Sequence, residues 1–317
     1  MTITIARSHS IYDLDAVQTA QARARAQQSA ELDALYDDML ELGAERFVTT
    51  PSSTEALTPL YDDCPNFAEV LDDLKRYLGL ALAGGGSMNV MPILLLGDPG
   101  VGKTHFGKRL ARALATEFEF ISMNALSAGF VITGSSSTWK GARCGKVAER
   151  LVRGKFANPV IVLDEVEKAT GSTQSDPMAA LYQLLEPETS RNFHDEYIDI
   201  DIDASQVFWV LTANSVEGIP SALLSRMAVY DVPAPTAEQA AGIGQRIYSG
   251  LLKELKLRQL EPELDASVSE KLAEISPREM RKALLDALGH AVADGRTALV
   301  PEDIRLRSEA GKRKIGF

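Results

Sequence analysis

The fold of this chain is decided by one stretch, Gly97-Asp98-Pro99-Gly100-Val101-Gly102-Lys103-Thr104. It follows the apolar run Val90 to Leu96 and leads into a helical pattern that extends through Ala115. The pattern G-x-x-x-x-G-K-[ST] between a strand and a helix is typical of a phosphate-binding loop. Glycines let backbone N–H groups close around phosphates, and the helix N-terminus adds partial positive charge. The alternative is a chance glycine turn before an ordinary helix.

This phosphate loop (residues 97–104) predicts a site for ATP and Mg²⁺. Lys103 is expected to reach the β- and γ-phosphates, and Thr104 to place its hydroxyl on Mg²⁺. The residues expected to contact nucleotide run from the loop into the first helical turn and comprise Gly97, Asp98, Pro99, Gly100, Val101, Gly102, Lys103, Thr104 and His105.

Composition narrows the class of protein. A length of 317 residues allows two domains, and the overall composition is that of a soluble globular protein. The chain has 33 basic and 44 acidic residues, and its net charge of −11 disfavours nucleic acid as the main partner. Cys64 and Cys144 have no spacing typical of a metal site or a disulfide framework. The N-terminus lacks an apolar signal-peptide core and no run approaches the ~18–20 apolar residues of a membrane span, so we expect a cytoplasmic protein.

The first 59 residues are expected to form a helical arm and a linker. From Ile11 to about Phe47 the sequence is rich in helix formers and has no interior proline, which predicts one long helix. Its second half has an apolar face, so the arm either docks on a neighbour or substrate, or packs on its own domain. The segment Thr49 to Pro59 is rich in Thr, Ser and Pro, which indicates a linker.

A second apolar run ends in two carboxylates. Residues Val160 to Leu163 are followed by Asp164 and Glu165, as expected for a buried parallel strand with acids at its carboxyl end. Asp164 is expected to hold Mg²⁺, and Glu165 to act as the general base that polarises the attacking water. The alternative is a strand that ends in a solvated acidic turn, which the phosphate loop about 60 residues upstream makes the weaker interpretation.

Further strands are expected at Phe118 to Ser122 and at Val207 to Thr212, and the second is followed by Asn214, whose amide can orient a water near the γ-phosphate. Between them, Ile198, Ile200 and Ile202 alternate with aspartates, which predicts a half-buried strand with a solvated acidic face rather than a metal cluster.

The Ser/Gly-rich segment Ser127 to Gly145 contains Trp139 and Lys140. A tryptophan in such a segment either packs back on the domain or makes a projecting contact.

After Pro235 the strand pattern stops, and the remainder is expected to be helical. Ser276-Pro277-Arg278-Glu279 has the features of a helix start, with Ser276 as N-cap and Glu279 at the capping-box position. Arg278 in the first turn is poorly matched to the helix dipole, and a nearby anion would offset this mismatch. We therefore favour Arg278 as a phosphate contact over a plain surface arginine.

Together these motifs resemble the AAA+ ATPases, and within that superfamily the ATPase module of Lon proteases. The resemblance extends from about Leu60 to Glu309. It implies an α/β fold, with an AAA+ parallel-sheet domain at residues 60–234 and a small all-helical lid domain at residues 235–317, preceded by the helical arm of residues 1–59. The motifs that carry it are GDPGVGKT, TWKGARCGKV, VIVLDEVEK, DPMAALYQLLEPE, NFHDEYIDI, VLTANSVEGIPSALLSRM and SPREMRKAL.

The resemblance also implies roles for individual residues. Asn214 corresponds to sensor 1, and Arg226 to the arginine finger that acts on the neighbouring subunit's nucleotide. Arg278 corresponds to sensor 2 in the helical lid. Trp139 falls where the family has a pore-loop aromatic residue that grips an unfolded polypeptide. The next residue is usually apolar in Lon, whereas Lys140 stands here, so the grip is expected to favour different or more acidic substrates.

The resemblance predicts a ring-forming, hexameric ATPase that couples ATP hydrolysis to protein unfolding, translocation or remodelling. The Lon substrate domains are replaced by the arm, and the sequence ends at Phe317, just after the lid, so we expect no intrinsic protease activity. Candidate partners are polypeptide substrates, an adaptor and a separate peptidase. The alternative is an ATP-switched scaffold that binds a partner through its arm, and a DNA-acting motor is disfavoured by the acidic balance.

Overall fold

The structure is a computed structural model that describes residues 4–124, 128–169 and 176–305. The chain divides into two compact units. The first comprises Met1–Leu60, Glu69–Gly97 and Lys103–Asp231, and the second comprises Tyr61–Ala68, Asp98–Gly102 and Val232–Phe317. The phosphate loop therefore passes from the first unit into the second at Asp98 and returns at Lys103.

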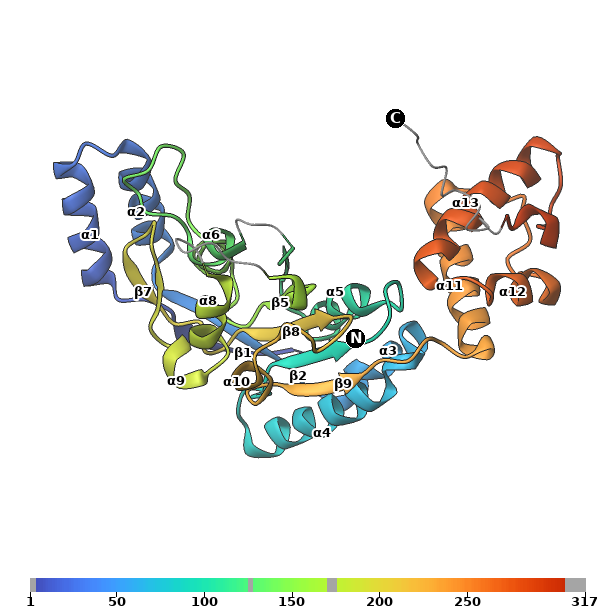
Figure 1. The fold of residues 1–317 in the computed structure, drawn as a ribbon, viewed down its shortest axis with the longest axis horizontal. Coiled ribbons are helices and arrows are strands. Elements are labelled where there is room, and N and C mark those ends of the chain that lie inside the picture. The colour runs from blue at the N-terminus through green and yellow to red at the C-terminus, as the bar shows by residue number, and fades with distance from the viewer. Residues whose placement is uncertain (1–3, 125–127, 170–175, 306–317) are drawn as a thin grey trace. The chain divides into compact units, whose positions relative to one another are not determined.

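The first unit contains a five-stranded sheet with the order β4-β5-β8-β3-β9 (Figure 1). Every neighbouring pair in this sheet is parallel, so the carboxyl ends of the strands lie at one edge. The parallel α/β architecture expected from the sequence is confirmed. The strands are β3 (Ile93–Leu96), β4 (Phe118–Ser122), β5 (Val160–Asp164), β8 (Phe208–Ala213) and β9 (Ala228–Asp231).

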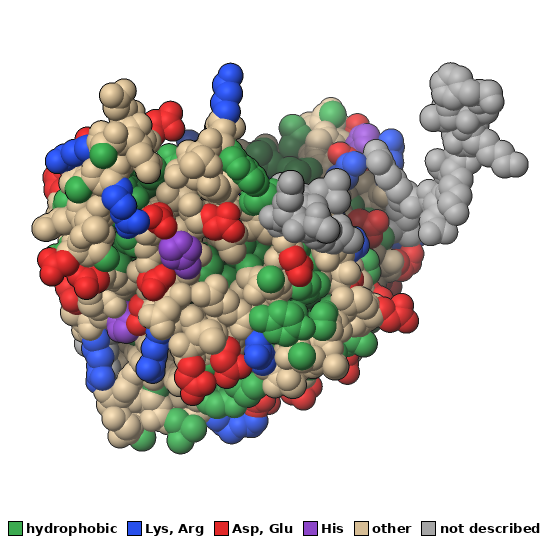
Figure 2. All heavy atoms as spheres, turned by 60° about the vertical axis from the view of Figure 1, so that its left-hand side comes forward, with side chains coloured by type: hydrophobic (Ala, Val, Ile, Leu, Met, Phe, Trp, Pro, Cys, Tyr) green, Lys and Arg blue, Asp and Glu red, His purple; other side chains and the backbone are tan. Residues whose placement is uncertain are grey.

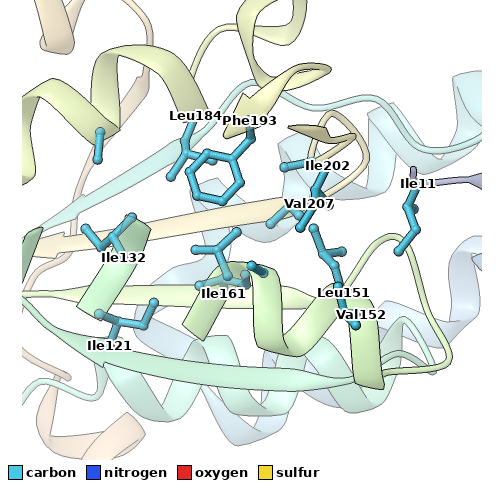
Figure 3. Close-up of a cluster of buried hydrophobic side chains, with 14 of the residues drawn as sticks. Ile11, Ile121, Ile132, Leu151, Val152, Ile161, Leu184, Phe193, Ile202 and Val207 are labelled. Atoms are coloured by element: carbon cyan, nitrogen blue, oxygen red, sulfur yellow. The ribbon is translucent and has the colours of Figure 1, made fainter. Parts of the chain in front are cut away.

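Helices cover both faces of this sheet. Helix α5 (Lys103–Ala113) packs so closely on β5 that a side chain at Gly107 would collide with Val162. The neighbouring residues Ile161 and Leu163 point to the opposite face, where they join a buried cluster with Leu151 (Figure 3). Beyond the N-terminal segment, the first unit also contains α4 (Ala68–Gly84), α6 (Ala128–Thr133), α7 (Lys146–Arg153), α8 (Pro177–Leu184), α9 (Pro187–Ser190) and α10 (Ser221–Leu224).

The N-terminal segment differs from the prediction of one long helix, which is wrong. Two helices, α1 (Leu14–Ala26) and α2 (Ala30–Leu42), are separated by a turn in which Gln28 has a left-handed φ of 59°. Strands β1 (Thr4–Ser10) and β2 (Glu45–Pro51) flank them and pair antiparallel. The helix formers are compatible with a single helix, but the turn between α1 and α2 lets the apolar face of α2 join the core of the first unit.

A hydrogen bond joins this helical arm to the rest of the first unit, and an ion pair joins its two helices to each other. Tyr36 donates a hydrogen bond through its hydroxyl to the carbonyl of Ile198, at 2.5 Å. Arg25 joins α1 to Asp33 on α2 at 2.7 Å. Of the two interpretations of the arm, packing on its own chain is therefore the one that the structure shows. The predicted linker is also wrong, because β2 extends to Pro51, and the 3-10 turn Thr54–Leu57 and helix α3 (Thr58–Asp63) follow.

A short antiparallel hairpin, β6 (Phe193–Asp195) and β7 (Ile200–Ile202), packs beside the arm. The alternation predicted here is confirmed, since Ile200 and Ile202 are buried and Asp201 is exposed. Strand β7 begins later than expected, because Asp199 has a left-handed φ of 53° and ends the turn of the hairpin.

The second unit is helical after residue 235, as predicted. Its helices are α11 (Ala237–Leu255), α12 (Ala266–Leu272) and α13 (Pro277–Ala293), with a 3-10 turn at Pro301–Asp303. They pack around buried Tyr248, Met280 and Leu284. The predicted start of α13 is confirmed, and the backbone N–H of Ser276 donates to the Glu279 carboxylate at 3.2 Å. Among the described residues, no helix combines the length and apolar character needed to cross a membrane.

Candidate functional site

The carboxyl ends of β3, β5 and β8 bring four predicted residues together. Lys103 donates from its ammonium group to the amide oxygen of Asn214 at 3.1 Å, and it also bonds the carbonyl of Gly97. Thr104 donates from its hydroxyl to Asp164 at 2.9 Å. The sheet order explains this, because β8 lies between β5 and β3 and the three strands are parallel.

The oxygen atoms of Thr104 and Asp164 suit a magnesium ion. Mg²⁺ prefers oxygen ligands and is usually held by one or two carboxylates together with substrate phosphates. A hydroxyl and a carboxylate that already contact each other beside the phosphate loop present such ligands. These two residues therefore fit the ion that the sequence predicts.

Thr212 completes this part of the site, and the sequence analysis missed it. Its side chain is buried at the end of β8, where the hydroxyl donates to Asp164 at 2.8 Å. The same hydroxyl accepts a hydrogen bond from the backbone N–H of Glu165 at 3.1 Å. Thr212 therefore fixes both acidic residues. The available signal was its place two residues before Asn214 on a buried strand.

The predicted general base, Glu165, is held by two side chains. Its backbone is left-handed, with φ of 59° and ψ of 50°. Asn124 donates to one carboxylate oxygen at 3.0 Å, and Lys168 donates to the other at 2.5 Å. The hydrogen bond from Lys168 is the main reason that the pKa of Glu165 is lowered; burial opposes this shift, and the hydrogen bond from Asn124 adds to it. Glu165 is therefore ionised at neutral pH. Neither Asn124 nor Lys168 was predicted from the sequence.

Within the second unit, the glycines of the phosphate loop pack against the start of α13. Gly100 has a φ of 90° and Gly102 a φ of 106°, which glycine adopts far more readily than other residues. A side chain at Gly100 would lie 3.2 Å from Ser276 and 3.7 Å from the Cβ atom of Arg278. Arg278 is thus beside the loop, as the predicted phosphate contact requires.

Arg278 and Asn66 differ in how they are held beside the loop. Arg278 is exposed, and its guanidinium has no hydrogen bond or ion pair with any residue in the described part of the chain. Asn66, which the sequence analysis also missed, is buried and donates from its amide to the carbonyls of Val101 at 3.2 Å and Pro233 at 3.0 Å. Asn66 therefore ties the loop to the chain that enters the helical part of the second unit.

Arg226 is held by α8 and the residue that precedes α9. Its Nε atom lies 3.0 Å from the Glu186 carboxylate, and it donates to the carbonyl of Tyr182 at 2.8 Å. The guanidinium also lies 5.2 Å from the centre of the Tyr182 ring. The Arg226 side chain is 31% exposed and that of Glu186 is 35% exposed, so the ion pair is partly solvated.

Trp139 both packs on the domain and projects from it. The residue is 49% exposed, and its ring meets the ring of Phe130 edge to face at 5.4 Å between centroids. Lys140 is exposed beside it. The ring of Trp139 therefore packs on the domain, and its role as a projecting contact stays a prediction. Phe130 also lines a pocket of about 350 Å³ together with Asp176, which precedes α8, Gln183 on α8 and His194 on β6.

The loop that carries Trp139, residues 134–145 and here called the aromatic loop, rests on one buried carboxylate. Asp195 has 0% exposure and accepts a hydrogen bond from the backbone N–H of Gly145 at 2.8 Å. At the other end of the loop, a side chain at Gly134 would lie 2.9 Å from the same carboxylate. Burial raises the pKa of Asp195 to about 6, although the backbone N–H bonds oppose this. Asp195 is another residue that the sequence analysis missed.

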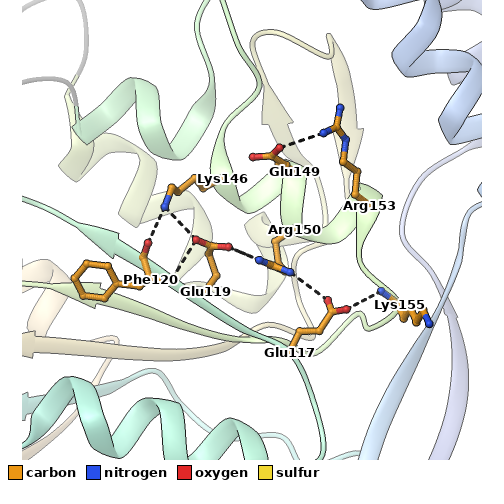
Figure 4. A network of polar contacts seen from close by, with 8 residues as sticks. All are labelled: Glu117, Glu119, Phe120, Lys146, Glu149, Arg150, Arg153 and Lys155. Carbon is orange, nitrogen blue, oxygen red and sulfur yellow. Dashed lines mark hydrogen bonds and ion pairs between the residues drawn. The ribbon is translucent and has the colours of Figure 1, made fainter.

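A polar network fastens the helix that follows the aromatic loop (Figure 4). Glu119 on β4 accepts hydrogen bonds from Arg150 at 2.6 Å and from Lys146 at 3.1 Å, both on α7. Burial alone would raise the pKa of Glu119, but these two cations outweigh it and lower the pKa. The network therefore ties α7 to an edge strand of the sheet.

Comparison with known proteins identifies what this site is similar to. Residues 93–231 match the ATPase family associated with various cellular activities (AAA). A Lon protease of Porphyromonas gingivalis is 41% identical over 161 residues, which are 51% of this chain and 19% of that protein. Lon protease 2 of Sorangium cellulosum is 36% identical over 227 residues, which are 67% of this chain and 28% of that protein.

Among solved structures, a Thermotoga maritima RuvB variant aligns with a TM-score of 0.49 and 18% identity, covering 75% of this chain and 66% of its own. The matched segments span only 19% and 28% of the length of the two Lon proteases. The AAA match contains the phosphate loop, Asp164, Asn214 and Arg226, whereas Arg278 lies beyond it.

Proposed function

We propose that this chain is a ring-forming motor. The premise is that residues 93–231 form an AAA ATPase domain similar to that of Lon proteases. The motor would couple ATP hydrolysis to the unfolding, translocation or remodelling of proteins, most simply as a hexamer. The observation that carries the proposal is the joined set of Lys103, Thr104, Asp164 and Asn214 at the carboxyl edge of the sheet. The proposal assigns no peptide hydrolysis to these residues.

In this proposal each side chain of the site has one task. Lys103 binds the phosphates, while Thr104 and Asp164 hold Mg²⁺, which when bound neutralises phosphate charge. Glu165 accepts the proton of the water that attacks the γ-phosphorus as the bond to ADP breaks. Asn214 orients that water, and Arg278 contacts the phosphates from the lid.

The proposal requires Glu165 to exchange partners. Its carboxylate is bonded to Asn124 and Lys168, and a general base needs a free oxygen within hydrogen-bond distance of the water. The Lys168 pair is partly exposed, at 49% for the lysine and 27% for the glutamate, so exchange with water there is inexpensive. We therefore expect Lys168 to release the Glu165 carboxylate.

Arg226 is proposed to act on the nucleotide of a neighbouring subunit. A partly solvated ion pair such as that with Glu186 contributes only about 0–1 kcal/mol, so the guanidinium can leave it when a subunit docks. An arginine supplied in trans links hydrolysis to assembly, because transition-state charge is neutralised only when the neighbour is present.

The substrate is proposed to be polypeptide, gripped by Trp139 and Lys140. Half of the Trp139 surface is exposed, and large exposed aromatic side chains are typical of contact sites. Figure 2 shows carboxylates (red) interspersed with Lys and Arg (blue) over the described part of one face, without a continuous basic stripe. With a net charge of −11, this arrangement favours protein over nucleic acid as substrate.

The arm offers little support for the scaffold alternative. An arm that recruits a partner needs a free apolar face, but Leu35, Tyr36 and Met39 of α2 are buried in the core of the first unit. We therefore favour the motor.

The Glu165→Gln variant tests the motor directly. It should bind ATP, assemble and retain an unfolded fluorescent polypeptide, while hydrolysing ATP about 10²–10⁴ times more slowly than the wild type. Sedimentation velocity across a range of protein concentrations measures assembly, and co-migration of the label measures capture. Lys103→Ala is the control and should neither assemble nor capture the labelled polypeptide. Monomers that hydrolyse ATP equally fast at every dilution would contradict the proposal.

A further inference from the structure

Glu167 lies in the 3-10 turn Val166–Lys168 after β5, and its carboxylate contacts the predicted sensor Asn214. The oxygen Oε1 accepts hydrogen bonds from the Asn214 backbone N–H at 3.2 Å and from the Asn214 side-chain amide at 2.9 Å. The other oxygen, Oε2, is buried and has no hydrogen-bond donor in the described part of the chain. A buried carboxylate oxygen without a donor is unfavourable, so packing alone does not explain a glutamate here.

The chemistry of a carboxylate supplies an explanation. The amide of Asn214 has an oxygen end and a nitrogen end of nearly the same shape, and its orientation depends on its partners. An ionised Glu167 only accepts hydrogen bonds, so the amide nitrogen must face it. The amide oxygen then faces the Lys103 ammonium, which only donates, at 3.1 Å. The two charged groups enforce one orientation of the amide between them.

The backbone holds Glu167 in place for this contact. Strands β5 and β8 are paired in register, with Leu163 opposite Leu211, which brings the residues after both strands together. The segment after Asn214 also approaches the backbone of Glu167 closely, as shown by Gly218, where a side chain would lie 3.0 Å from the Glu167 carbonyl. Gly218 has a φ of 88°, a conformation that favours glycine.

We infer that Glu167 is a positioning residue for ATP hydrolysis, and that it acts by fixing the orientation of the Asn214 amide. The inference rests on the proposed function, in which Asn214 orients the attacking water. Glu167 acts only through Asn214. Lys103 keeps its second partner, the Gly97 carbonyl, so losing Glu167 should impair catalysis far more than ATP binding.

A double-mutant cycle tests the inference. Glu167→Ala should lower kcat about tenfold while changing the Kd for ATP less than about threefold. Glu167→Gln should lie between this variant and the wild type, because a glutamine can also donate to Asn214 and so allows the reversed amide. The Glu167→Ala, Asn214→Ala double variant should be no slower than Asn214→Ala alone, since Glu167 has nothing left to orient.

The matched control is Glu217→Ala, which removes an exposed glutamate three residues after Asn214 and should keep the wild-type kcat. Thermal unfolding checks that each variant folds, and Glu167→Gln carries the test if the alanine variant does not. The inference is overturned if Glu167→Ala has normal kcat. It is also overturned if Glu167→Ala lowers kcat by the same factor in the Asn214→Ala background as in the wild type. A wild type that hydrolyses no ATP would instead overturn the proposed function.

Discussion

Both the phosphate loop and the aromatic loop are held by residues distant in the chain, at separations of 60 and 111 residues for Thr104–Asp164 and Lys103–Asn214 and of 50 residues for Gly145–Asp195, but only the phosphate loop is itself a recurrent sequence motif. The phosphate loop is joined by sequence to the strand before it and the helix after it, and its partners are residues at the ends of parallel strands. The aromatic loop rests on Asp195, which lies 50 residues after Gly145 on a separate hairpin. The phosphate loop and the acids after its partner strand are recognised from local patterns in the sequence, whereas no local pattern marks Asp195 as an anchor.

The same difference separates the functions that we assign. The residues around the phosphate loop are tightly bonded to one another, as a site that positions phosphates requires. The aromatic loop is fixed at its base and exposed at its tip. We therefore expect substitutions near the phosphate loop to affect catalysis, and substitutions in the aromatic loop to affect coupling to substrate.

The largest effect is expected at Arg226. Arg226→Ala should lower kcat of the assembled protein by about 10³ or more while nucleotide still binds, because transition-state charge loses its neutralising cation. Steady-state ATPase assays and equilibrium binding of a fluorescent nucleotide measure the two quantities. Glu186→Ala is the matched control, since it removes the partner of Arg226 in the same chain and should change kcat only a few-fold. Full activity of Arg226→Ala would remove the finger assignment.

The aromatic loop should show the opposite pattern. Trp139→Ala should lower the amount of polypeptide unfolded per ATP hydrolysed by about tenfold, because an exposed aromatic anchor is lost. A fluorescent substrate with a stable fold reports unfolding, and phosphate release reports hydrolysis in the same sample. Trp139→Phe retains an aromatic ring and should keep most of the coupling. An unchanged ratio for the alanine variant would mean that Trp139 only packs on Phe130.

A smaller effect at Thr212 would show how much of the phosphate site lies outside its motif. Thr212→Val keeps the shape but removes the hydroxyl that bonds Asp164 and the backbone of Glu165, and it should lower kcat about three- to tenfold. Thr212→Ser should restore activity. The comparison of kcat across a Mg²⁺ titration measures this effect, and equal values for all three proteins would show that the hydroxyl has no part in catalysis.

The smallest effect concerns the anchor of the aromatic loop. Because the folded-state pKa of Asp195 is raised to about 6 from 3.8, the neutral form fits the fold better than the charged form. The stability contributed by protonation is complete below the unfolded pKa and is lost as pH rises through about 6. The free energy of unfolding of the wild type, relative to Asp195→Asn, should therefore rise by about 1 kcal/mol between pH 7 and pH 5.

Urea unfolding of both proteins at pH 7, 6 and 5 measures this difference. Glu196→Gln, which changes an exposed neighbour on the same hairpin, serves as the control for general charge effects. A difference between wild type and Asp195→Asn that does not vary with pH would show that Asp195 is not a buried titrating group.

Much of the site was predictable because each of its main residues follows a recognisable strand. The apolar runs before Gly97 and Asp164 indicated buried strands, and parallel strands place their carboxyl ends together. Thr212, Asn124 and Asn66 were not predictable in this way. They are ordinary polar residues whose roles depend on which strand or loop lies beside them, and nothing in their own surroundings in sequence reveals that neighbour.

The N-terminal segment shows the limit of helix propensity. Strong helix formers around Gln28 are compatible with one helix or with two, because intrinsic propensities differ by only about 0–0.7 kcal/mol per residue. The gain from burying Leu35, Tyr36 and Met39 against the core is larger, so tertiary packing decides in favour of the turn.

By itself, the sequence determined the phosphate loop, the order of strand and helix around it, the acids of β5 and the helical end of the chain. These features depend on local periodicity and on residue types that chemistry requires at fixed spacing. Only the tertiary structure decided the fold of the arm, the partners of Glu165 and Arg226, and the anchoring of the aromatic loop on Asp195. Apart from the pair of Glu165 with Lys168, which lies three residues later, those contacts join residues far apart in the chain. Their free energy exists only once the strands and helices have packed together.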